Sequence, residues 1–185
     1  NRNIRAEWRY LHNTFGGVGL LSLSTEATIA RVNLFMQHWG MPTPIGQMLQ
    51  TSMEALQLEI GCVGCPLQEP FHPMGAVTTH CWLRSFWEVV DKYRLSLEIE
   101  YKDIPLPREN DVTITSIAIS QGFGDDELLS ITRCRLACCS VFLSDITGAS
   151  GRYLDPTRGQ PGIDYSPYTS YNFPREQPSH KDWSV

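Results

Sequence analysis

Four side chains in the first half of the sequence have the chemistry of a zinc site, and they are Cys62, Cys65, His80 and Cys81. A C-x2-C pair of thiols and a later pair of histidine or cysteine ligands can complete a tetrahedron around Zn²⁺. An adjacent His-Cys pair is not the usual second half of such a site. We therefore favour buried or free thiols in a loop, with zinc binding as the alternative.

Two adjacent carboxylates, Asp125 and Asp126, follow Phe123 and Gly124. Adjacent aspartates at the tip of a strand hairpin can hold the metal ions that align an attacking hydroxyl. Here the polar residues 120–122 precede the pair and a helical pattern follows it, so the flanking apolar strands are missing. Acidic side chains stabilise the first turn of a helix, because they oppose the positive end of the helix dipole. We therefore interpret the pair as the start of a helix.

Other catalytic signatures are missing from the sequence. It contains no nucleophile elbow, no G-x-x-x-x-G-K-[ST] loop and no His-Glu-x-x-His pattern. Glu98 and Glu100 alternate with apolar residues, which is typical of the exposed face of a strand rather than of a catalytic pair. We therefore expect no self-contained active site and no catalytic residue in this chain.

A possible binding face lies on a predicted helix near the N-terminus. Thr28, Arg31 and His38 share one arc of this helix with Phe35, at helical spacing. Such a face can contact the sugar-phosphate backbone of a duplex without reading its sequence. One arginine is a weak electrostatic signal, so an ordinary solvated face is an equally good interpretation.

Glycines precede this helix, and Gly16, Gly17 and Gly19 predict a joint. Glycine adopts backbone angles that other residues avoid and lets another backbone approach closely. We expect Ser24 or Thr25 to cap the helix that follows. The apolar residues predicted to face the core from it are Ile29, Val32, Met36 and Trp39.

A second helix is predicted to begin at Thr43 and Pro44 and to close at Gly61. We expect the first two helices to pack as an antiparallel pair. The residues predicted for the buried side of the second helix are Ile45, Met48, Leu49, Ser52, Leu56 and Ile60. Those predicted for its polar side are Gln47, Gln50, Glu54 and Gln57.

The middle of the chain mixes element types. A loop rich in glycine and proline over residues 61–77 leads to a predicted helix over 79–93. Residues 95–101 alternate between apolar and polar types, with the period of a half-buried strand. Residues 112–119 suit either a helix or a strand, and a further helix is expected from 125 to about 142. The predicted apolar face of the 79–93 helix is Trp82, Phe86, Val90 and Tyr93.

Two arginines, Arg133 and Arg135, lie in the middle of the last predicted helix. We expect at least one of them to be a buried structural cation, paired with Asp145 or with the acidic middle region. Beyond Gly148 the chain is rich in proline and aromatic residues. This composition predicts an extended tail on the surface.

These elements predict a mainly α protein of the α+β type. We expect a helical bundle over residues 1–61, an α+β connecting segment with a small β element over 62–150, and an extended Pro/Tyr-rich tail over 151–185. With 185 residues, of which 42% are hydrophobic, the three parts should form one folded unit. The chain starts without methionine and stops within an aromatic and proline pattern, so we interpret it as an excised piece of a longer protein.

Charge is distributed unevenly along the chain, whose net charge is −5. Residues 1–40 carry four arginines against two glutamates, whereas residues 54–130 carry five cations against thirteen acidic residues. Any phosphate contact is therefore expected at the ends of the chain. No apolar run approaches the roughly 18 residues that span a bilayer. The six cysteines are too sparse for a disulfide scaffold. We expect an intracellular location, nuclear or cytoplasmic, and no membrane association.

Several stretches of the chain resemble LINE-type (non-LTR) retrotransposon reverse transcriptases. Residues 8–39, with an aromatic residue before Gly-Gly-Val-Gly-Leu and a helix running to Gln-His-Trp, look like the segment just after the catalytic palm. In those enzymes a glycine hinge leads into the helical thumb. Residues 132–136, 142–146 and 171–176 are similar to segments that follow the thumb.

The resemblance implies a thumb-like, non-catalytic region of an RNA-directed DNA polymerase. The parent enzyme would copy RNA into DNA with Mg²⁺ and deoxynucleotides, using catalytic aspartates that this chain lacks. The region itself would need no cofactor. It would hold the RNA/DNA primer–template duplex through Thr28, Arg31 and His38, with the glycines of residues 16–19 as its hinge, beside the rest of the parent chain.

Two other functions remain open. A protein-interaction or zinc-stabilised binding module without enzymatic activity would use residues 62–81 and the Tyr/Pro-rich tail. A nuclease built on the acidic middle region is the third possibility, and it requires carboxylates that converge on a metal. Stoichiometric zinc that is lost together with the fold would favour the binding module.

Overall fold

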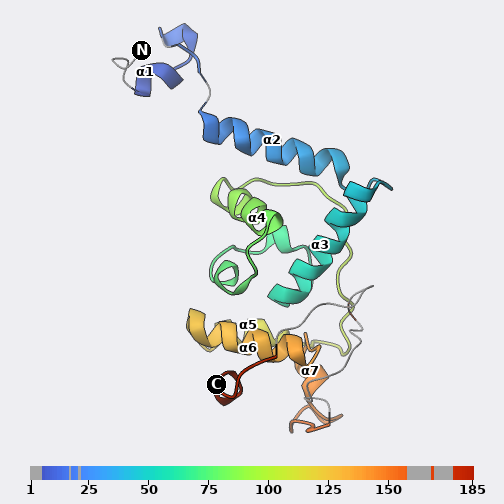
Figure 1. Ribbon diagram of the computed structural model, residues 1–185. Coiled ribbons are helices and arrows are strands. Elements are labelled where there is room, and N and C mark those ends of the chain that lie inside the picture. Colours follow the sequence, from blue (N-terminus) through green and yellow to red (C-terminus); the bar gives the residue numbers. More distant parts are fainter. Residues whose placement is uncertain (1–5, 17, 21, 158–167, 169–176) are drawn as a thin grey trace.

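The computed structural model describes residues 6–16, 18–20, 22–157, 168 and 177–185. Within these residues the chain is mainly helical, which confirms the predicted fold class. The helices are α1 (Ala6–Tyr10), α2 (Leu23–His38), α3 (Pro44–Ile60), α4 (Trp82–Lys92), α5 (Ile114–Ser120), α6 (Asp125–Ala137) and α7 (Leu143–Ile146). Short 3₁₀ turns are η1 (Asn13–Phe15), η2 (Pro66–Gln68), η3 (Met74–Val77) and η4 (Asp182–Ser184). Figure 1 shows α2 above α3 and α4, with α5, α6 and α7 below them.

β structure is limited, among the described residues, to two isolated antiparallel bridges, Thr113 to Phe142 and Thr147 to Leu154. The predicted strand over residues 95–101 is therefore wrong. The backbone there has no assigned strand, yet the predicted alternation of half-buried and exposed residues is present. A period of two requires only an extended chain with one covered face, and the main helical core covers that face. The residues that pack against this core are Leu95, Leu97, Ile99 and Tyr101.

α2 begins after a serine cap at Ser22, whose Oγ accepts a hydrogen bond from the Thr25 N–H at 3.1 Å. The predicted caps, Ser24 and Thr25, are therefore wrong and lie inside the helix. Ser22 has the extended backbone that an N-cap requires, and it leaves Glu26 in the first turn.

The buried side of α2 differs from the predicted stripe. Phe35 is fully buried, whereas Ile29 and Met36 are 45% and 42% exposed. Val32 and Trp39 are half-buried and pack against the core. The core therefore lies under a line through Val32, Phe35 and Trp39, because the large ring of Phe35 removes more apolar area from water than Ile29 or Met36 would.

α3 confirms the predicted start and stop signals. The Thr43 side chain accepts a hydrogen bond from the Gly46 N–H at 3.1 Å, Pro44 is the first helical residue, and Gly61 ends the helix with a left-handed φ of 71°. α2 and α3 meet at a corner (Figure 1), so the predicted antiparallel pairing is wrong. The reason is that the only buried residue assigned to α2 is Phe35, near its C-terminal end, so the rest of the helix does not pack along α3.

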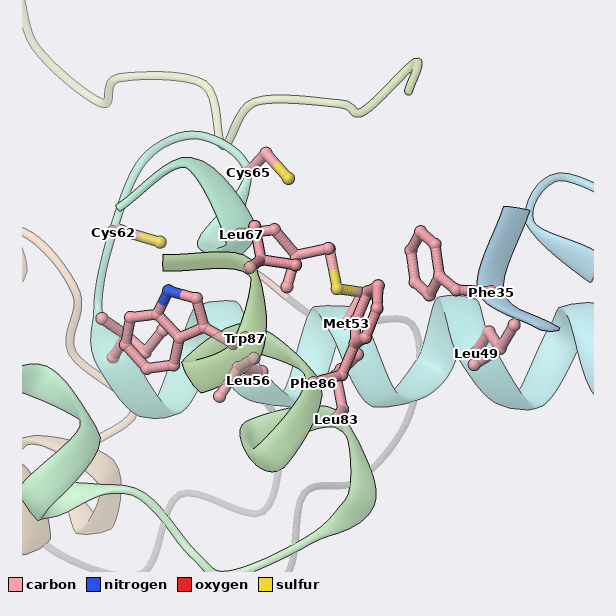
Figure 2. Packing of buried hydrophobic residues seen from close by; sticks show 12 residues of the cluster. Phe35, Leu49, Met53, Leu56, Cys62, Cys65, Leu67, Leu83, Phe86 and Trp87 are labelled. Atoms are coloured by element: carbon pink, nitrogen blue, oxygen red, sulfur yellow. The ribbon is translucent and has the colours of Figure 1, made fainter. Parts of the chain in front are cut away.

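The main core lies between α2, α3 and α4 and includes the predicted loop after Gly61 (Figure 2). Its fully or nearly fully buried members include Phe35, Leu49, Met53, Leu56, Leu67, Leu83, Phe86, Trp87 and Val90. The indole N–H of Trp87 donates to the Glu69 carbonyl oxygen at 2.8 Å, which ties the loop to α4. Trp82 and Tyr93, predicted to face the core, are 39% and 47% exposed, since the buried side of α4 passes through Leu83 and Trp87 instead.

The second half of the chain builds two smaller clusters around α5, α6 and α7. α5 makes residues 114–119 of the undecided segment 112–119 a helix, capped by Thr113. α6 ends at Ala137 rather than near residue 142, because Cys139 takes a left-handed φ of 53° and turns the chain. Phe142 is then fully buried in one of the clusters.

No helix in the described part of the chain has the length and apolar character needed to cross a membrane.

Candidate nucleic-acid interface

The three candidate binding residues, Thr28, Arg31 and His38, lie on α2 and are all half-buried. Phe35, which shares their arc, is fully buried. The arc is therefore the edge between the core side and the solvent side of α2, and not a freely solvated face. The Thr28 hydroxyl donates to the Ser24 carbonyl oxygen at 2.9 Å within the helix, so its proton is already used there.

An aromatic stack holds the C-terminal end of α2. Phe35 stacks on Trp39 at a centroid distance of 5.2 Å and on Phe86 at 4.9 Å. Trp82 stacks on Phe86, with a centroid distance of 5.4 Å. Tyr101 stacks on Trp39, with a centroid distance of 6.0 Å. Stacked rings at these distances attract one another beyond their area burial. The five rings therefore join α4, α2 and the extended segment into one packed unit.

The glycines predicted to form a joint, Gly16 and Gly19 among the described residues, lie in a hydrogen-bonded turn. Gly16 and Gly19 have left-handed φ values of 80° and 67°, and a Cβ on Gly19 would lie 2.6 Å from Oδ1 of Asn13. The Gly19 and Leu20 N–H groups donate to carbonyl oxygens of residues 11 and 9, both at 2.9 Å. Glycine is thus favoured at both positions. Gly17 lies outside the described residues.

The candidate zinc ligands lie in different environments. Cys62 and Cys65 are buried in the loop after α3, whereas His80 and Cys81 are exposed. The Cys81 sulfur accepts a hydrogen bond from the Arg84 N–H at 3.4 Å and caps α4. Burial raises the pKa of the Cys62 thiol to about 12, and it also raises the pKa of Cys65. Among the described residues, no three His, Cys, Asp or Glu side chains form a group suited to a metal ion.

Asp125 and Asp126 occupy the first turn of α6, which confirms their interpretation as a helix start. Both are exposed. Gly124 is the N-cap residue, and its N–H donates to Oε2 of Glu127 at 2.9 Å. Three carboxylates thus lie at the positive end of one helix, where they stabilise it.

The two arginines of α6 have different roles. Arg135 is 3% exposed, as the prediction of a buried cation requires, but its guanidinium donates hydrogen bonds to the carbonyl oxygens of Ser140 and Glu59 rather than to Asp145. Asp145 instead accepts hydrogen bonds from the Val141 and Phe142 N–H groups, both at 2.8 Å. The backbone therefore supplies the partners that the prediction assigned to side chains.

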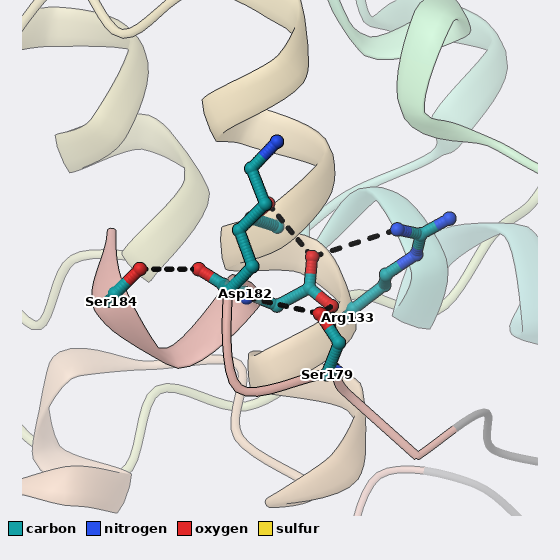
Figure 3. Close-up of polar contacts among 6 residues, drawn as sticks. Arg133, Ser179, Asp182 and Ser184 are labelled. Atoms are coloured by element: carbon teal, nitrogen blue, oxygen red, sulfur yellow. Dashed lines mark hydrogen bonds and ion pairs between the residues drawn. The ribbon is translucent and has the colours of Figure 1, made fainter.

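Arg133 contacts the end of the chain, which sequence analysis missed (Figure 3). Its Nη1 lies 3.6 Å from Oδ1 of Asp182, and the same oxygen accepts a hydrogen bond from the Ser130 hydroxyl at 2.9 Å. The other carboxylate oxygen accepts hydrogen bonds from the N–H and hydroxyl of Ser179. These bonds lower the pKa of Asp182 to about 2, with the Ser179 hydroxyl as the largest cause. The tail therefore ends in a turn docked on α6 and is not extended there.

A pocket of about 610 Å³ lies beside the C-terminal end of α2. Its charged lining residues are Glu54, Glu100, Asp103 and Lys102. Three carboxylates against one ammonium group give a negative potential, which repels phosphate. A nucleic-acid backbone on this molecule would therefore avoid this pocket.

Comparison with known proteins found no matching family model, no matching curated protein and no matching solved structure.

Proposed function

We propose that this chain is the thumb and connecting region of a retrotransposon RNA-directed DNA polymerase, in which α2 helps to position the primer–template duplex. The proposal rests on the resemblance of residues 8–39, 132–136, 142–146 and 171–176, the last of which lies outside the described residues. The observation that carries it is the placement of α2. This helix is fixed at its C-terminal end by Phe35, while most residues of its first two turns are exposed to solvent.

Charge supports contact through residues 1–40, which include α2, rather than through the helical body. Residues 1–40 have more arginines than acidic residues, whereas residues 54–130 have an excess of eight negative charges, with thirteen acidic residues against five cations. A polyanion is attracted by the first region and repelled by the second. Arg31 is the cation of α2 and lies at its partly exposed edge.

In this proposal the chemistry belongs to the parent polymerase, which would use Mg²⁺ and its own aspartates. The chain itself positions nucleic acid and needs no cofactor. Its partners are an RNA/DNA duplex and the remainder of the parent polymerase, in the nucleus or cytoplasm.

The first prediction concerns Arg31. We expect the chain to bind a labelled RNA/DNA hybrid duplex weakly, with an affinity that falls as salt rises, because phosphate contacts release counterions. The Arg31→Ala substitution should lower the affinity and reduce the slope of log affinity against log salt by about one. Fluorescence anisotropy over a salt series measures both quantities.

Arg152→Ala is the matched control, because it removes the same charge from an exposed residue on the tail side of the molecule. It should leave the slope unchanged. Binding that responds neither to salt nor to Arg31→Ala would contradict the proposed role of α2. Primer extension by this chain in the presence of Mg²⁺ would contradict its non-catalytic assignment.

A protein-interaction module is the second candidate function. The observation in its favour is a set of large apolar side chains that are exposed on α2, in the connection after it and at the start of α3, among them Leu23, Leu34, Met41, Ile45 and Met48. Apolar surface of this kind marks protein-binding sites more often than nucleic-acid sites. A zinc-stabilised form of this module predicts metal that is lost together with the fold, which metal analysis of the purified protein would detect.

A further inference from the structure

Another pocket, of about 650 Å³, lies between α3, α6 and the segment that contains η3. Small-molecule pockets in proteins have volumes of about 300–1,000 Å³. Each helix lines this pocket with one face, because its lining residues recur at i, i+3, i+4 and i+7. Those of α3 are Ser52, Ala55, Leu56 and Glu59, and those of α6 are Leu129, Thr132, Arg133 and Leu136. We call this space the α3–α6 pocket.

The walls of the α3–α6 pocket are largely apolar, and its charges balance. Its large apolar side chains are Leu56, Val77, Leu129 and Leu136. Its charged residues are Glu59 and Arg133, one of each sign, whereas the pocket beside α2 has three carboxylates against one ammonium group. A charged ligand would lose its hydration here without gaining a net counter-charge. The lining therefore favours a neutral ligand with an apolar body.

Several polar groups around the α3–α6 pocket already pair with one another. The Glu59 carboxylate accepts hydrogen bonds from the N–H and the hydroxyl of Thr79. The Thr78 hydroxyl donates to a carbonyl oxygen of η3 at 3.1 Å. Nη1 of Arg133 lies 3.6 Å from Oδ1 of Asp182. These groups are therefore occupied within the protein.

The buried hydroxyl of Thr132 differs from them. Thr132 is 4% exposed, and its hydroxyl makes no hydrogen bond with any residue that the structure describes. The hydroxyl is not among the fully enclosed polar atoms, so the small exposed surface of this residue faces the pocket that it lines. A buried polar group without a hydrogen bond costs free energy. A hydroxyl can both donate and accept, so any ligand oxygen that reaches Thr132 removes this cost.

We infer that the α3–α6 pocket binds a neutral small molecule that has an apolar body and one hydrogen-bonding oxygen, which pairs with the Thr132 hydroxyl. Burial of the apolar body against the leucine side chains drives binding, and the hydrogen bond fixes its orientation. This site goes beyond the duplex contact proposed above and does not depend on it. Its binding is measured without nucleic acid, so failure of one proposal leaves the other standing.

The test uses the full chain and the dye Nile red. This dye is neutral, largely apolar and carries a carbonyl oxygen, and its emission moves to shorter wavelengths in apolar surroundings. Titration should show saturable binding. Thr132→Val should weaken it by about three- to tenfold, because the shape of the side chain is kept and one hydrogen bond is lost. The same variant should not lower the unfolding free energy, because the hydroxyl has no partner to lose in the free protein.

Thr147→Val is the matched control. Thr147 is also 4% exposed, but its hydroxyl donates to the Leu143 carbonyl oxygen at 3.0 Å, and it does not line the α3–α6 pocket. This variant should lower the unfolding free energy and leave the affinity for the dye unchanged. The two threonine variants should therefore show opposite patterns of stability and binding.

A second pair of variants locates the dye. Ala55→Trp places a large side chain in the α3–α6 pocket and should weaken binding by at least about tenfold. Ala27→Trp adds the same side chain at an exposed position of α2 and should leave the affinity unchanged. If the larger side chain at residue 55 disturbs the fold, the threonine pair decides the question. Three results would overturn the inference: no saturable binding, an unchanged affinity in Thr132→Val, or equal losses for the two tryptophan variants.

Discussion

Arg135 illustrates how one side chain connects distant parts of this molecule. Its guanidinium donates to the carbonyl oxygens of Ser140 and of Glu59, which is 76 positions away in the sequence. Glu59 lies in the last turn of α3, where carbonyl oxygens carry the negative end of the helix dipole. Burial lowers the pKa of Arg135 to about 10, so the side chain remains charged at neutral pH. The Arg135 cation therefore supplies a hydrogen-bond donor to a carbonyl oxygen at the C-terminal end of α3 and opposes the negative end of its dipole.

The second prediction follows from these bonds. Arg135→Met should destabilise the protein by about 2–4 kcal/mol, because two buried carbonyl oxygens lose their donors. Arg133→Met is the comparison, since Arg133 is 41% exposed and its ion pair with Asp182 is screened by solvent. It should change the unfolding free energy by less than about 1 kcal/mol. Urea unfolding measures both changes, and similar losses for the two variants would contradict the structural role of Arg135.

Single-residue partners of this kind were beyond prediction from sequence. Gln57 was assigned to the polar side of its helix, yet it is 4% exposed. Its amide nitrogen donates to the Val63 and Gly64 carbonyl oxygens, and its oxygen accepts from the Tyr101 hydroxyl. A polar residue can be buried when distant groups satisfy it, and periodicity does not reveal those groups. The arc of candidate binding residues was also predicted from periodicity alone, and it passes through Phe35, which is buried.

At the scale of elements, the ends of α3 were predictable, whereas the predicted cap of α2, the predicted end of α6 and the predicted faces of α2 and α4 were wrong. The ends of α3 depend on Thr43, Pro44 and Gly61, whose effects on the backbone are local, and all three were confirmed. Faces depend on which neighbour a helix meets. The predicted stripes of α2 and α4 were therefore displaced, and residues 95–101 have the period of a strand without a partner strand in the described chain.

The third prediction compares two helix ends. Gly40 and Gly61 both have left-handed φ values, of 73° and 71°, so alanine should cost about 1–2 kcal/mol at either position. A Cβ on Gly61 would also lie 2.6 Å from Oγ1 of Thr115 and 2.8 Å from Cζ of Arg135, whereas nothing lies within 4 Å of one on Gly40. Gly61→Ala should therefore be less stable than Gly40→Ala by about a further 1–3 kcal/mol. Equal urea-unfolding midpoints for the two variants would contradict this prediction, because they would show that Thr115 and Arg135 move aside at little cost.

At the scale of the whole molecule, the end of the chain is attached to α6 by one buried carboxylate. Asp182 accepts hydrogen bonds from Ser130 and Ser179 and lies beside Arg133. This docking was not predictable from composition, which indicates only an extended tail. A Ser-x-x-Asp sequence was the available signal, because it suits a short helical turn with its serine as the cap.

The fourth prediction concerns the pH dependence of this attachment. The bonds lower the pKa of Asp182 from 3.8 to about 2, so they favour the charged carboxylate in the folded protein. Their stabilisation should be complete above pH 3.8 and should be lost as the pH falls towards about 2. The protection factors of the amides of residues 177–185, which correct for the pH dependence of intrinsic exchange, should therefore fall over this range.

Asp182→Asn provides the control for that assignment. The variant keeps the size of the side chain but removes its charge, so the protection of residues 177–185 against exchange should already be low at neutral pH. It should also change little on acidification. Unchanged protection in the variant would show that other contacts hold the tail.

The aromatic stack has a consequence for any movement within a larger assembly. Because its rings continue from α4 through α2 to Tyr101, α2 cannot tilt alone without separating rings in the interior. Rotation about the glycines at 16 and 19 would turn the helix and the body beneath it together. If α2 contacts a duplex as proposed, that duplex would meet a single stiff block rather than a helix that moves alone.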